Sequence, residues 1–273
     1  MVTLATQTSR SLPASPLRSA RALLAPLLTA SKLSDRLVAH SIGEFACAGE
    51  RHPLTRFIFD GPRGGGDPIR LAIFAGIHGD EPAGVVALAQ FLIELAAQPD
   101  LAKGYRIFAY PIINPTGYEA NTRHSAAGVD LNREFWRGSP QPEVQLLEAE
   151  LTRHEFHGIV ALHSDDTSPG VYGFTRGPDL SKDLLEPALW AAEKFFRRNT
   201  DGVIDGFRAR RGLIDGGYEG ILSAPADQQP APFEIVFETP ALAPLPLQVA
   251  ATNAALRRVL ADYRAVISLA QHI

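Results

Sequence analysis

Three side chains of types that bind zinc stand where apolar stretches of the sequence end. His78 and Glu81 are three residues apart in Gly76-Ile77-His78-Gly79-Asp80-Glu81, at the turn into a predicted helix, so both can converge on one point. His163 directly follows the apolar run Gly158–Leu162. Imidazole nitrogens and carboxylate oxygens are good zinc ligands, and a site with three protein ligands leaves a fourth position for water, as in catalytic zinc sites. Each residue alone is a weak signal, but the three together predict one zinc ion.

Further polar residues are of types that could take part in hydrolysis, by polarising a carbonyl, holding a carboxylate or accepting a proton. Arg123 and the segment Asp130-Leu131-Asn132-Arg133 lie between the predicted ligands in the chain. An arginine can polarise a carbonyl and stabilise the oxyanion that develops on it, or it can hold a carboxylate with a bidentate fork. Glu238 directly follows the apolar run Phe233–Phe237, and a carboxylate beside a metal-bound water is a natural general base.

The elements that must position these residues alternate along the chain. Near-continuous apolar runs predict strands covered on both faces, and Asp80 and Pro82 predict the N-cap and first turn of a helix. Alternating strands and helices indicate an α/β fold with a mixed, mostly parallel central sheet flanked by helices, in which sites form at the carboxyl ends of the strands. Strands are expected at 57–59, 69–75, 105–113, 158–162 and 233–237, and helices at 82–97, 143–154, 184–198 and 249–269.

Composition narrows the class of protein. The length of 273 residues fits one large domain. The net charge of −4 gives no indication of the basic face that binding to nucleic acid requires. The sequence lacks an apolar run of the roughly 18 residues that a membrane span requires. The single cysteine, Cys47, excludes an intrachain disulfide, and its alanine neighbours favour a small buried hydrophobe over a nucleophile.

The N-terminal residues differ in composition from the remainder. Residues 1–34 contain Arg10, Arg18, Arg21 and Lys32 but no acidic residue. This composition is compatible with a targeting sequence, and Ala22–Ala30 could form a short apolar core, although Pro26 interrupts it. We expect instead that residues 1–50 form an N-terminal segment, helical and packed on a hydrolase domain of residues 51–273. A cytoplasmic location is then expected, with export left open.

Five motifs in order carry a resemblance to a known family. They are the H-G-D-E loop, N-P-x-G-Y, D-L-N-R, the histidine at a strand end, and the late glutamate, and they extend from about Ile69 to Thr239. This set resembles the M14 zinc carboxypeptidase superfamily, which includes the succinylglutamate desuccinylase and aspartoacylase branch. The resemblance implies the zinc carboxypeptidase-like fold in a single domain, with one Zn²⁺ per chain.

The resemblance also implies a role for each matching residue. His78, Glu81 and His163 would bind zinc, and Asp130 would orient His78 through its other ring nitrogen, as partners of metal ligands commonly do. Glu238 would take a proton from water and deliver it to the leaving amine. The remaining matches concern the substrate: Arg123 would polarise the scissile carbonyl, Asn132 and Arg133 would hold a free carboxylate, and Tyr218 would be the mobile tyrosine of the carboxypeptidases.

The implied reaction is hydrolysis of an amide bond next to a free carboxylate. Tyr218 stands twenty residues before Glu238, and the 35 residues after Glu238 read mainly as one helix, whereas the aspartoacylase branch usually continues into a C-terminal β domain. These features favour a metallocarboxypeptidase acting on small peptides. An N-acyl-amino-acid deacylase stays as the alternative, and a non-catalytic ligand-binding module as a second one. A second metal near Asp165 and Asp166, the side-chain specificity and the oligomeric state are left open.

Overall fold

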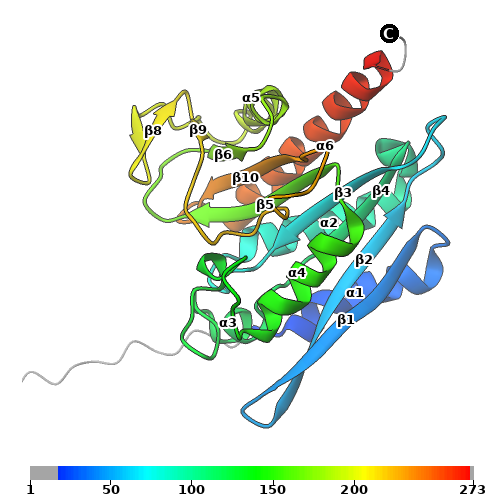
Figure 1. Cartoon of the computed structure of the whole chain (residues 1–273), viewed down its shortest axis with the longest axis vertical. Coiled ribbons are helices and arrows are strands. Elements are labelled where there is room, and N and C mark those ends of the chain that lie inside the picture. The colour runs from blue at the N-terminus through cyan, green and yellow to red at the C-terminus, as the bar shows by residue number, and fades with distance from the viewer. Residues whose placement is uncertain (1–17, 271–273) are drawn as a thin grey trace, which may run out of the picture.

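One mixed ten-stranded sheet forms the centre of the described part of the chain, residues 18–270 of a computed structural model (Figure 1). Its strand order is β1-β2-β4-β3-β5-β10-β6-β9-β8-β7. The strands are β1 Leu37–Cys47, β2 Glu50–Asp60, β3 Ile69–Ala75, β4 Tyr105–Tyr110, β5 Gly158–Asp165, β6 Tyr172–Arg176, β7 Val203–Ile204, β8 Phe207–Arg210, β9 Leu213–Asp215 and β10 Phe233–Pro240. The helices are α1 Ala20–Leu33, α2 Pro82–Ala97, α3 Pro115–Ala120, α4 Pro142–His154, α5 Leu180–Ala192 and α6 Leu245–Ala270.

Four parallel strands in the middle of the sheet, β4, β3, β5 and β10, carry the apolar runs. Strands β2 and β6 flank them in the antiparallel sense. Nearly every residue of β3 and β5 is buried, because helices cover both faces of a parallel sheet. The mixed sheet flanked by helices that the sequence predicts is therefore confirmed. Its central four strands are parallel, whereas five of the nine neighbouring pairs in the whole sheet, β1–β2, β2–β4, β10–β6, β7–β8 and β8–β9, are antiparallel.

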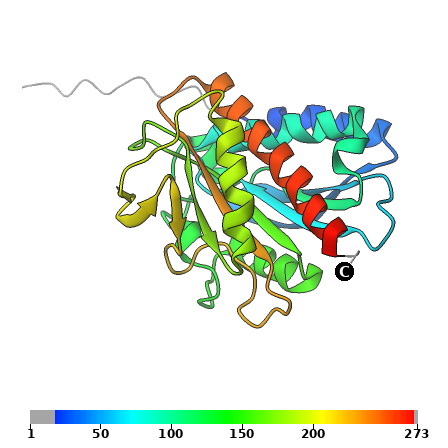
Figure 2. The ribbon, with the colours of Figure 1, turned by 90° about the horizontal axis from the view of Figure 1, so that it is seen from above.

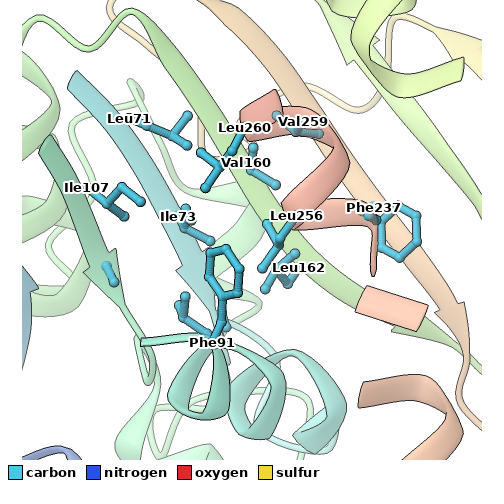
Figure 3. Packing of buried hydrophobic residues seen from close by; sticks show 14 of the residues in the cluster. Leu71, Ile73, Phe91, Ile107, Val160, Leu162, Phe237, Leu256, Val259 and Leu260 are labelled. Atoms are coloured by element: carbon cyan, nitrogen blue, oxygen red, sulfur yellow. The ribbon is translucent and has the colours of Figure 1, made fainter. Parts of the chain in front are cut away.

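Helices α1, α2, α5 and α6 cover one face of the sheet (Figure 2). Side chains that alternate along each strand point to this face, among them Leu71 and Ile73 of β3, and they pack against Phe91 of α2 and Leu256 of α6 (Figure 3). All four side chains are at most 2% exposed, and burial of each apolar side chain of this size stabilises the fold by about 1.5–3 kcal/mol.

The opposite face packs against α4. The intervening residues of β3, Ala72 and Phe74, point to this side and share a second core with Leu147 and Leu151 of α4. The alternation of a strand therefore divides β3 between two cores, and this division fixes its register because a shift by one residue would exchange the two sets.

The N-terminal segment departs from the prediction for residues 1–50. Residues 1–17 lie outside the described residues, α1 spans Ala20–Leu33 with Leu27 fully buried, and Leu37–Cys47 is a strand rather than helix. The hairpin β1–β2 turns at Ala48 and Gly49, which both have positive φ, as a two-residue type I′ turn requires. Ala-Gly is a weak signal for this turn, so the sequence reading missed the hairpin. The predicted domain division falls at this turn, and it stays a prediction.

Two smaller expectations need correction. Cys47, at the end of β1, is half-buried instead of fully buried. Helix α2 begins at Pro82 as predicted, but its N-cap is Glu81 rather than Asp80, and the Glu81 side chain makes no capping bond. The Glu81 carboxylate is turned away from the helix toward two histidines.

Candidate active site

A cavity of about 540 Å³ lies at the carboxyl ends of β3, β5 and β10. Eight of the nine predicted site residues line it, and the ninth, Asp130, is bonded to one of them. The eight are His78, Glu81, Arg123, Asn132, Arg133, His163, Tyr218 and Glu238. Parallel strands bring their carboxyl ends to one edge, so residues that lie far apart in the sequence meet there.

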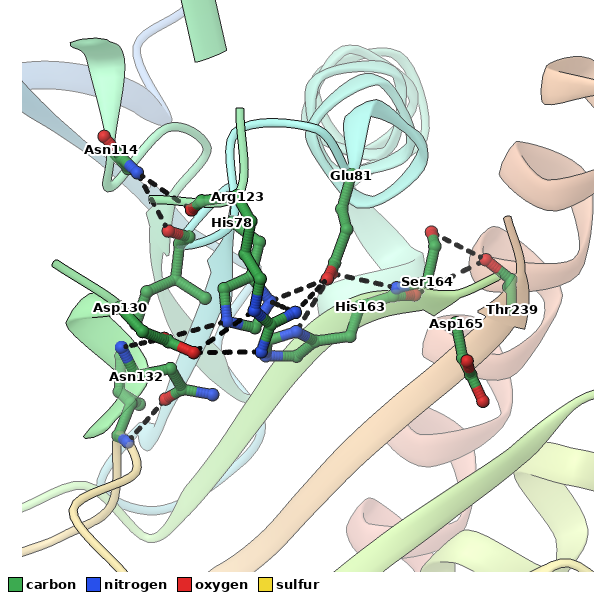
Figure 4. Close-up of polar contacts among 12 residues, drawn as sticks. His78, Glu81, Asn114, Arg123, Asp130, Asn132, His163, Ser164, Asp165 and Thr239 are labelled. Carbon is green, nitrogen blue, oxygen red and sulfur yellow. Dashed lines mark hydrogen bonds and ion pairs between the residues drawn. The ribbon is translucent and has the colours of Figure 1, made fainter. Parts of the chain in front are cut away.

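The three predicted ligands converge on one point (Figure 4). His78 Nδ1 lies 2.6 Å from Oε1 of Glu81, and His163 Nδ1 lies 3.0 Å from Oε2 of the same carboxylate. One donor atom from each residue falls within 4.8 Å of the others, and all three side chains are buried. Two imidazole nitrogens and a carboxylate are the donor set of a catalytic zinc site, so these residues fit the metal that the motifs imply.

Local backbone features hold the ligands in place. At Gly79 a Cβ would lie only 1.9 Å from the carbonyl carbon of Gly117, so this position lets the His78 loop pack directly on α3. The backbone N–H of Ser164 donates to Oε2 of Glu81 at 3.0 Å. His163 and Glu238 are directly opposite each other in the parallel pair β5–β10, so their side chains emerge on the same side of the sheet.

The charges of the three groups are mutually dependent. Burial would raise the pKa of Glu81, but the adjacent His78 and His163 outweigh burial and hold that pKa well below 4.5. Burial holds the pKa of His163 below 6.5, whereas for His78 the Glu81 carboxylate and the bond to Asp130 overcome burial and raise the pKa. A metal binds the carboxylate anion and the neutral form of each imidazole, so a metal bound here would displace the proton that Glu81 favours on His78.

Asp130 links the ligand set to Arg123. Its Oδ1 lies 3.2 Å from Nε2 of His78, the ring nitrogen that faces away from Glu81. Its Oδ2 accepts from Nε and Nη2 of Arg123 at 3.2 and 3.1 Å. Burial would raise the pKa of Asp130, but the bond to His78 and the two nearby cations keep it well below its ordinary value. Arg123 also places Nη1 within 3.3 Å of His78 Nδ1, so its guanidinium faces the metal ligands.

Asn132, Arg133 and Tyr218 form the wall next to Arg123. Asn132 accepts from the backbone N–H of Leu222 at 2.9 Å through Oδ1, which leaves its amide NH₂ available to a ligand. The Arg133 guanidinium stacks 4.0 Å from the centre of the Tyr218 ring. The Tyr218 hydroxyl donates to Oδ1 of Asp205 at 2.9 Å. The tyrosine expected to be mobile is therefore anchored at both ends in this structure.

Glu238 is the buried acid of the cavity without a bonding partner among the described residues. Its side chain lines the cavity and the residue is 8% exposed. Burial raises the pKa of Glu238 well above 4.5, and the charges of Glu81, Asp165 and Asp205 raise it further. A carboxylate with a raised pKa accepts a proton more readily near neutral pH.

The sequence reading missed several lining residues. Tyr172 of β6 donates its hydroxyl to Oδ2 of Asp165 at 2.9 Å, and Asp205 stands at the tip of the β7–β8 hairpin. Phe174, Ile221 and Val236 supply apolar surface beside them. Asp205-Gly206 is a hairpin-turn signal, but nothing in the sequence shows that this turn reaches the site.

The described part of the chain contains one group of potential metal ligands. Among residues 18–270, His78, Glu81 and His163 are the one set of three histidine, cysteine or acidic residues whose potential ligand atoms all lie within 4.8 Å of one another. Asp165 is bonded instead to Thr167 and Tyr172. None of the helices in the described part of the chain combines the length and apolarity needed to cross a membrane.

Part of the chain matches a known protein family. Residues 67–194 match the model of the succinylglutamate desuccinylase/aspartoacylase catalytic domain. The matched segment includes His78, Glu81 and His163 and ends before Tyr218 and Glu238. No curated protein sequence matches the chain significantly.

Solved structures extend the likeness over most of the chain. A presumed metallopeptidase from Shewanella baltica OS155 is 27% identical with a TM-score of 0.69, over 88% of this chain and 90% of that one. Another from Shewanella denitrificans OS217 is 23% identical with a TM-score of 0.72, over 94% and 98%. A metallo-carboxypeptidase from Burkholderia cenocepacia shares the fold at 16% identity and a TM-score of 0.67, over 90% and 68%. The family-model match and these structures support the resemblance to the superfamily that joins the M14 zinc carboxypeptidases with the succinylglutamate desuccinylases and aspartoacylases, which the motifs predict.

Proposed function

We propose that the chain is a zinc-dependent hydrolase that cleaves an amide bond next to a free carboxylate, as a metallocarboxypeptidase of small peptides. The observation that carries this proposal is the meeting of His78, Glu81 and His163 within 4.8 Å at a cavity that Glu238 also lines. When bound to these three residues, zinc would supply Lewis acidity and a more acidic water.

The side chains of this protein would perform the remaining chemistry. Asn132 and Arg133 would hold the free carboxylate of the substrate, the arginine through its planar fork. Arg123, anchored by Asp130, would stabilise negative charge on the carbonyl oxygen. Asp130 would keep the proton of His78 on Nε2, so that Nδ1 is free to bind metal.

Proton transfer would fall to Glu238. Its carboxylate has no competing bond among the described residues, and its raised pKa suits a group that takes a proton from the attacking water and returns it to the leaving amine. A Glu238→Gln variant should therefore retain zinc but lose about 100- to 10,000-fold in turnover, the usual range for general acid–base catalysis.

The second candidate is hydrolysis of an N-acyl amino acid. The match of residues 67–194 to the succinylglutamate desuccinylase/aspartoacylase catalytic domain favours it. Both reactions need a carboxylate clamp and a proton carrier, so the residues described above serve either one. The two reactions differ in the size of the acyl group: a carboxypeptidase accepts a peptide on the acyl side of the bond, whereas a deacylase accepts a small acyl group there.

Metal content and substrate preference together test the proposal. We expect about one zinc per chain in the purified protein, lost in His163→Ala and retained in His124→Ala, an exposed histidine of the neighbouring loop. Peptides of increasing length are then compared with N-acetyl and N-succinyl amino acids. Turnover of peptides supports the carboxypeptidase, and turnover of acyl-amino acids alone supports the deacylase. Bound zinc without turnover of any amide would indicate a binding module.

A further inference from the structure

Acidic side chains dominate the wall of the cavity. Its lining holds two guanidinium groups, Arg123 and Arg133, against a larger set of carboxylates: Asp80, Glu81, Asp165, Asp166, Asp205 and Glu238. A bound divalent cation would add two positive charges and still leave an excess of negative charge. Such a wall attracts cationic groups and opposes a second carboxylate on the substrate.

Two of these carboxylates, Asp165 and Asp205, have no cationic partner within the described residues. Each accepts a hydroxyl at 2.9 Å, Asp165 from Tyr172 and Asp205 from Tyr218. A continuous row of aromatic rings joins the two tyrosines: the ring centres of Tyr172 and Phe174 are 5.8 Å apart, those of Phe174 and Phe207 5.7 Å, and those of Phe207 and Tyr218 4.8 Å. The two acids are therefore held at the two ends of one aromatic row, and both line the cavity.

The Tyr218 end of this row adjoins the proposed carboxylate clamp. Arg133 stacks on the Tyr218 ring whose hydroxyl binds Asp205. A substrate whose α-carboxylate is held by Arg133 would thus have Asp205 on the far side of the same tyrosine. Glu238, 92% buried and unpartnered among the described residues, faces this space as well.

Part of the cavity wall is apolar. Phe174, Ile221 and Val236 line the cavity, and Phe174 and Ile221 are 5% and 7% exposed. The Phe174 ring lies 5.8 Å from that of Tyr172, whose hydroxyl bonds Asp165. A lysine or arginine side chain has a matching construction, because its methylene stem packs on apolar surface while its charged end remains polar.

We infer that the substrate's C-terminal residue carries a cationic side chain, with its stem on Phe174, Ile221 and Val236 and its charge between Asp165 and Asp205. This inference rests on the proposed function and deepens it by naming the substrate class. The same wall disfavours the dicarboxylate substrates, N-acyl-glutamates and N-acyl-aspartates, because their side-chain carboxylate would meet Asp205.

Matched dipeptides test the charge requirement. Benzoylglycyl-lysine and benzoylglycyl-norleucine differ by the side-chain ammonium, and the arginine and glutamate analogues extend the series in both directions. We expect kcat/KM for lysine or arginine to exceed that for norleucine at least about tenfold, with glutamate lower still; each tenfold step equals about 1.4 kcal/mol. Asp205→Asn keeps an oxygen for the Tyr218 hydroxyl and should reduce the lysine-to-norleucine ratio about tenfold.

A control separates local contact from overall charge. Asp201→Asn makes the same change of charge at an exposed residue just before β7 that does not line the cavity, and it should leave the ratio intact. Equal or better cleavage of the norleucine or glutamate dipeptide by the wild type would overturn the inference. So would an Asp205→Asn ratio equal to that of Asp201→Asn.

Binding distinguishes failure of this inference from failure of the proposed function. If the zinc-loaded wild type hydrolyses none of these dipeptides, the proposed peptidase activity fails. Calorimetric titration with free L-lysine and L-norleucine then measures the charge preference without turnover. Tighter binding of lysine, weakened in Asp205→Asn, supports the cationic site, whereas equal affinities would overturn it.

Discussion

Glu150 should stabilise the fold by an amount that depends strongly on pH. It lies on α4 and is 4% exposed, and it accepts from the Tyr110 hydroxyl of β4 at 2.8 Å and from Arg56 of β2. Burial would raise the pKa of this carboxyl, but bonds to His154, Tyr110 and Arg56 outweigh burial and lower it to about 2. The cluster therefore links the helix to the sheet through one ionised carboxylate.

The size and the sign of the effect follow from this shift. A folded pKa of about 2 against an ordinary value of 4.5 corresponds to about 3 kcal/mol, at about 1.4 kcal/mol per pH unit. Because the folded pKa is the lower one, this stabilisation is fully present above pH 4.5 and disappears as the pH falls from 4.5 to 2. Roughly 2 kcal/mol of it should be lost by pH 3.

Urea unfolding of Glu150→Gln beside the wild type measures this contribution. At pH 7 the variant should be about 3 kcal/mol less stable, because Arg56 is left largely buried without its charge partner, and at pH 3 the difference should shrink to about 1 kcal/mol. Taking the difference between the two proteins cancels the other titrating groups. The matched control is Glu44→Gln, which breaks the exposed pair with Arg51 and should cost less than about 1 kcal/mol at either pH. A pH-independent difference, or one no larger than in the control, would refute the reasoning.

Three further changes test the arrangement of the site. Gly79→Ala should lower the free energy of unfolding by about 1–3 kcal/mol and weaken zinc binding, because the new Cβ would lie 1.9 Å from the backbone of Gly117. The control is Gly202→Ala, whose new Cβ would have no atom within 4 Å. Equal melting temperatures and zinc affinities of the two variants would contradict this account. Asp130→Asn should weaken zinc binding about 10- to 100-fold in a chelator competition, since it disturbs the proton on His78 Nε2; an unchanged affinity would remove Asp130 from that role. Arg133→Lys keeps the charge but loses the bidentate fork and the stack on Tyr218, so KM should rise about tenfold or more with kcat less affected, and an unaltered KM would exclude it from the carboxylate clamp.

The positions of the candidate site residues were predictable because the topology of the sheet determines where they meet. Apolar runs identified β3, β5 and β10, and in parallel strands the next polar residue necessarily stands at the common carboxyl edge. His163 and Glu238 are such residues, and their pairing across β5 and β10 follows from the register. Their convergence needed no knowledge of the loops.

Elements held by local pairing were less predictable. Strand β1 follows the edge of the sheet and depends on a turn at Ala48-Gly49, whose sequence is uncommon for a type I′ turn. Strands β7, β8 and β9 have 2, 4 and 3 residues, too few for an alternating pattern to emerge. The position of Asp205 results from these short strands, so its place in the cavity could not be read from the sequence.

This division explains why the reaction class could be predicted before the substrate. The groups that would act on the amide bond lie at or just after the ends of the buried strands β3, β5 and β10, or in the segment Asn114–Arg133, whose Tyr118 and Leu131 belong to the two cores. The groups that would contact the substrate's side chain come from the β7–β8 hairpin and from Ile221, which are placed by a few local bonds such as that from Tyr218 to Asp205. Substitutions in this second set should alter which substrate is preferred without altering the ligand set, because no hydrogen bond joins Asp205 to His78, Glu81 or His163 among the described residues. Preference for a cationic, neutral or anionic side chain could therefore change between related proteins while the H-G-D-E loop and Glu238 stay the same.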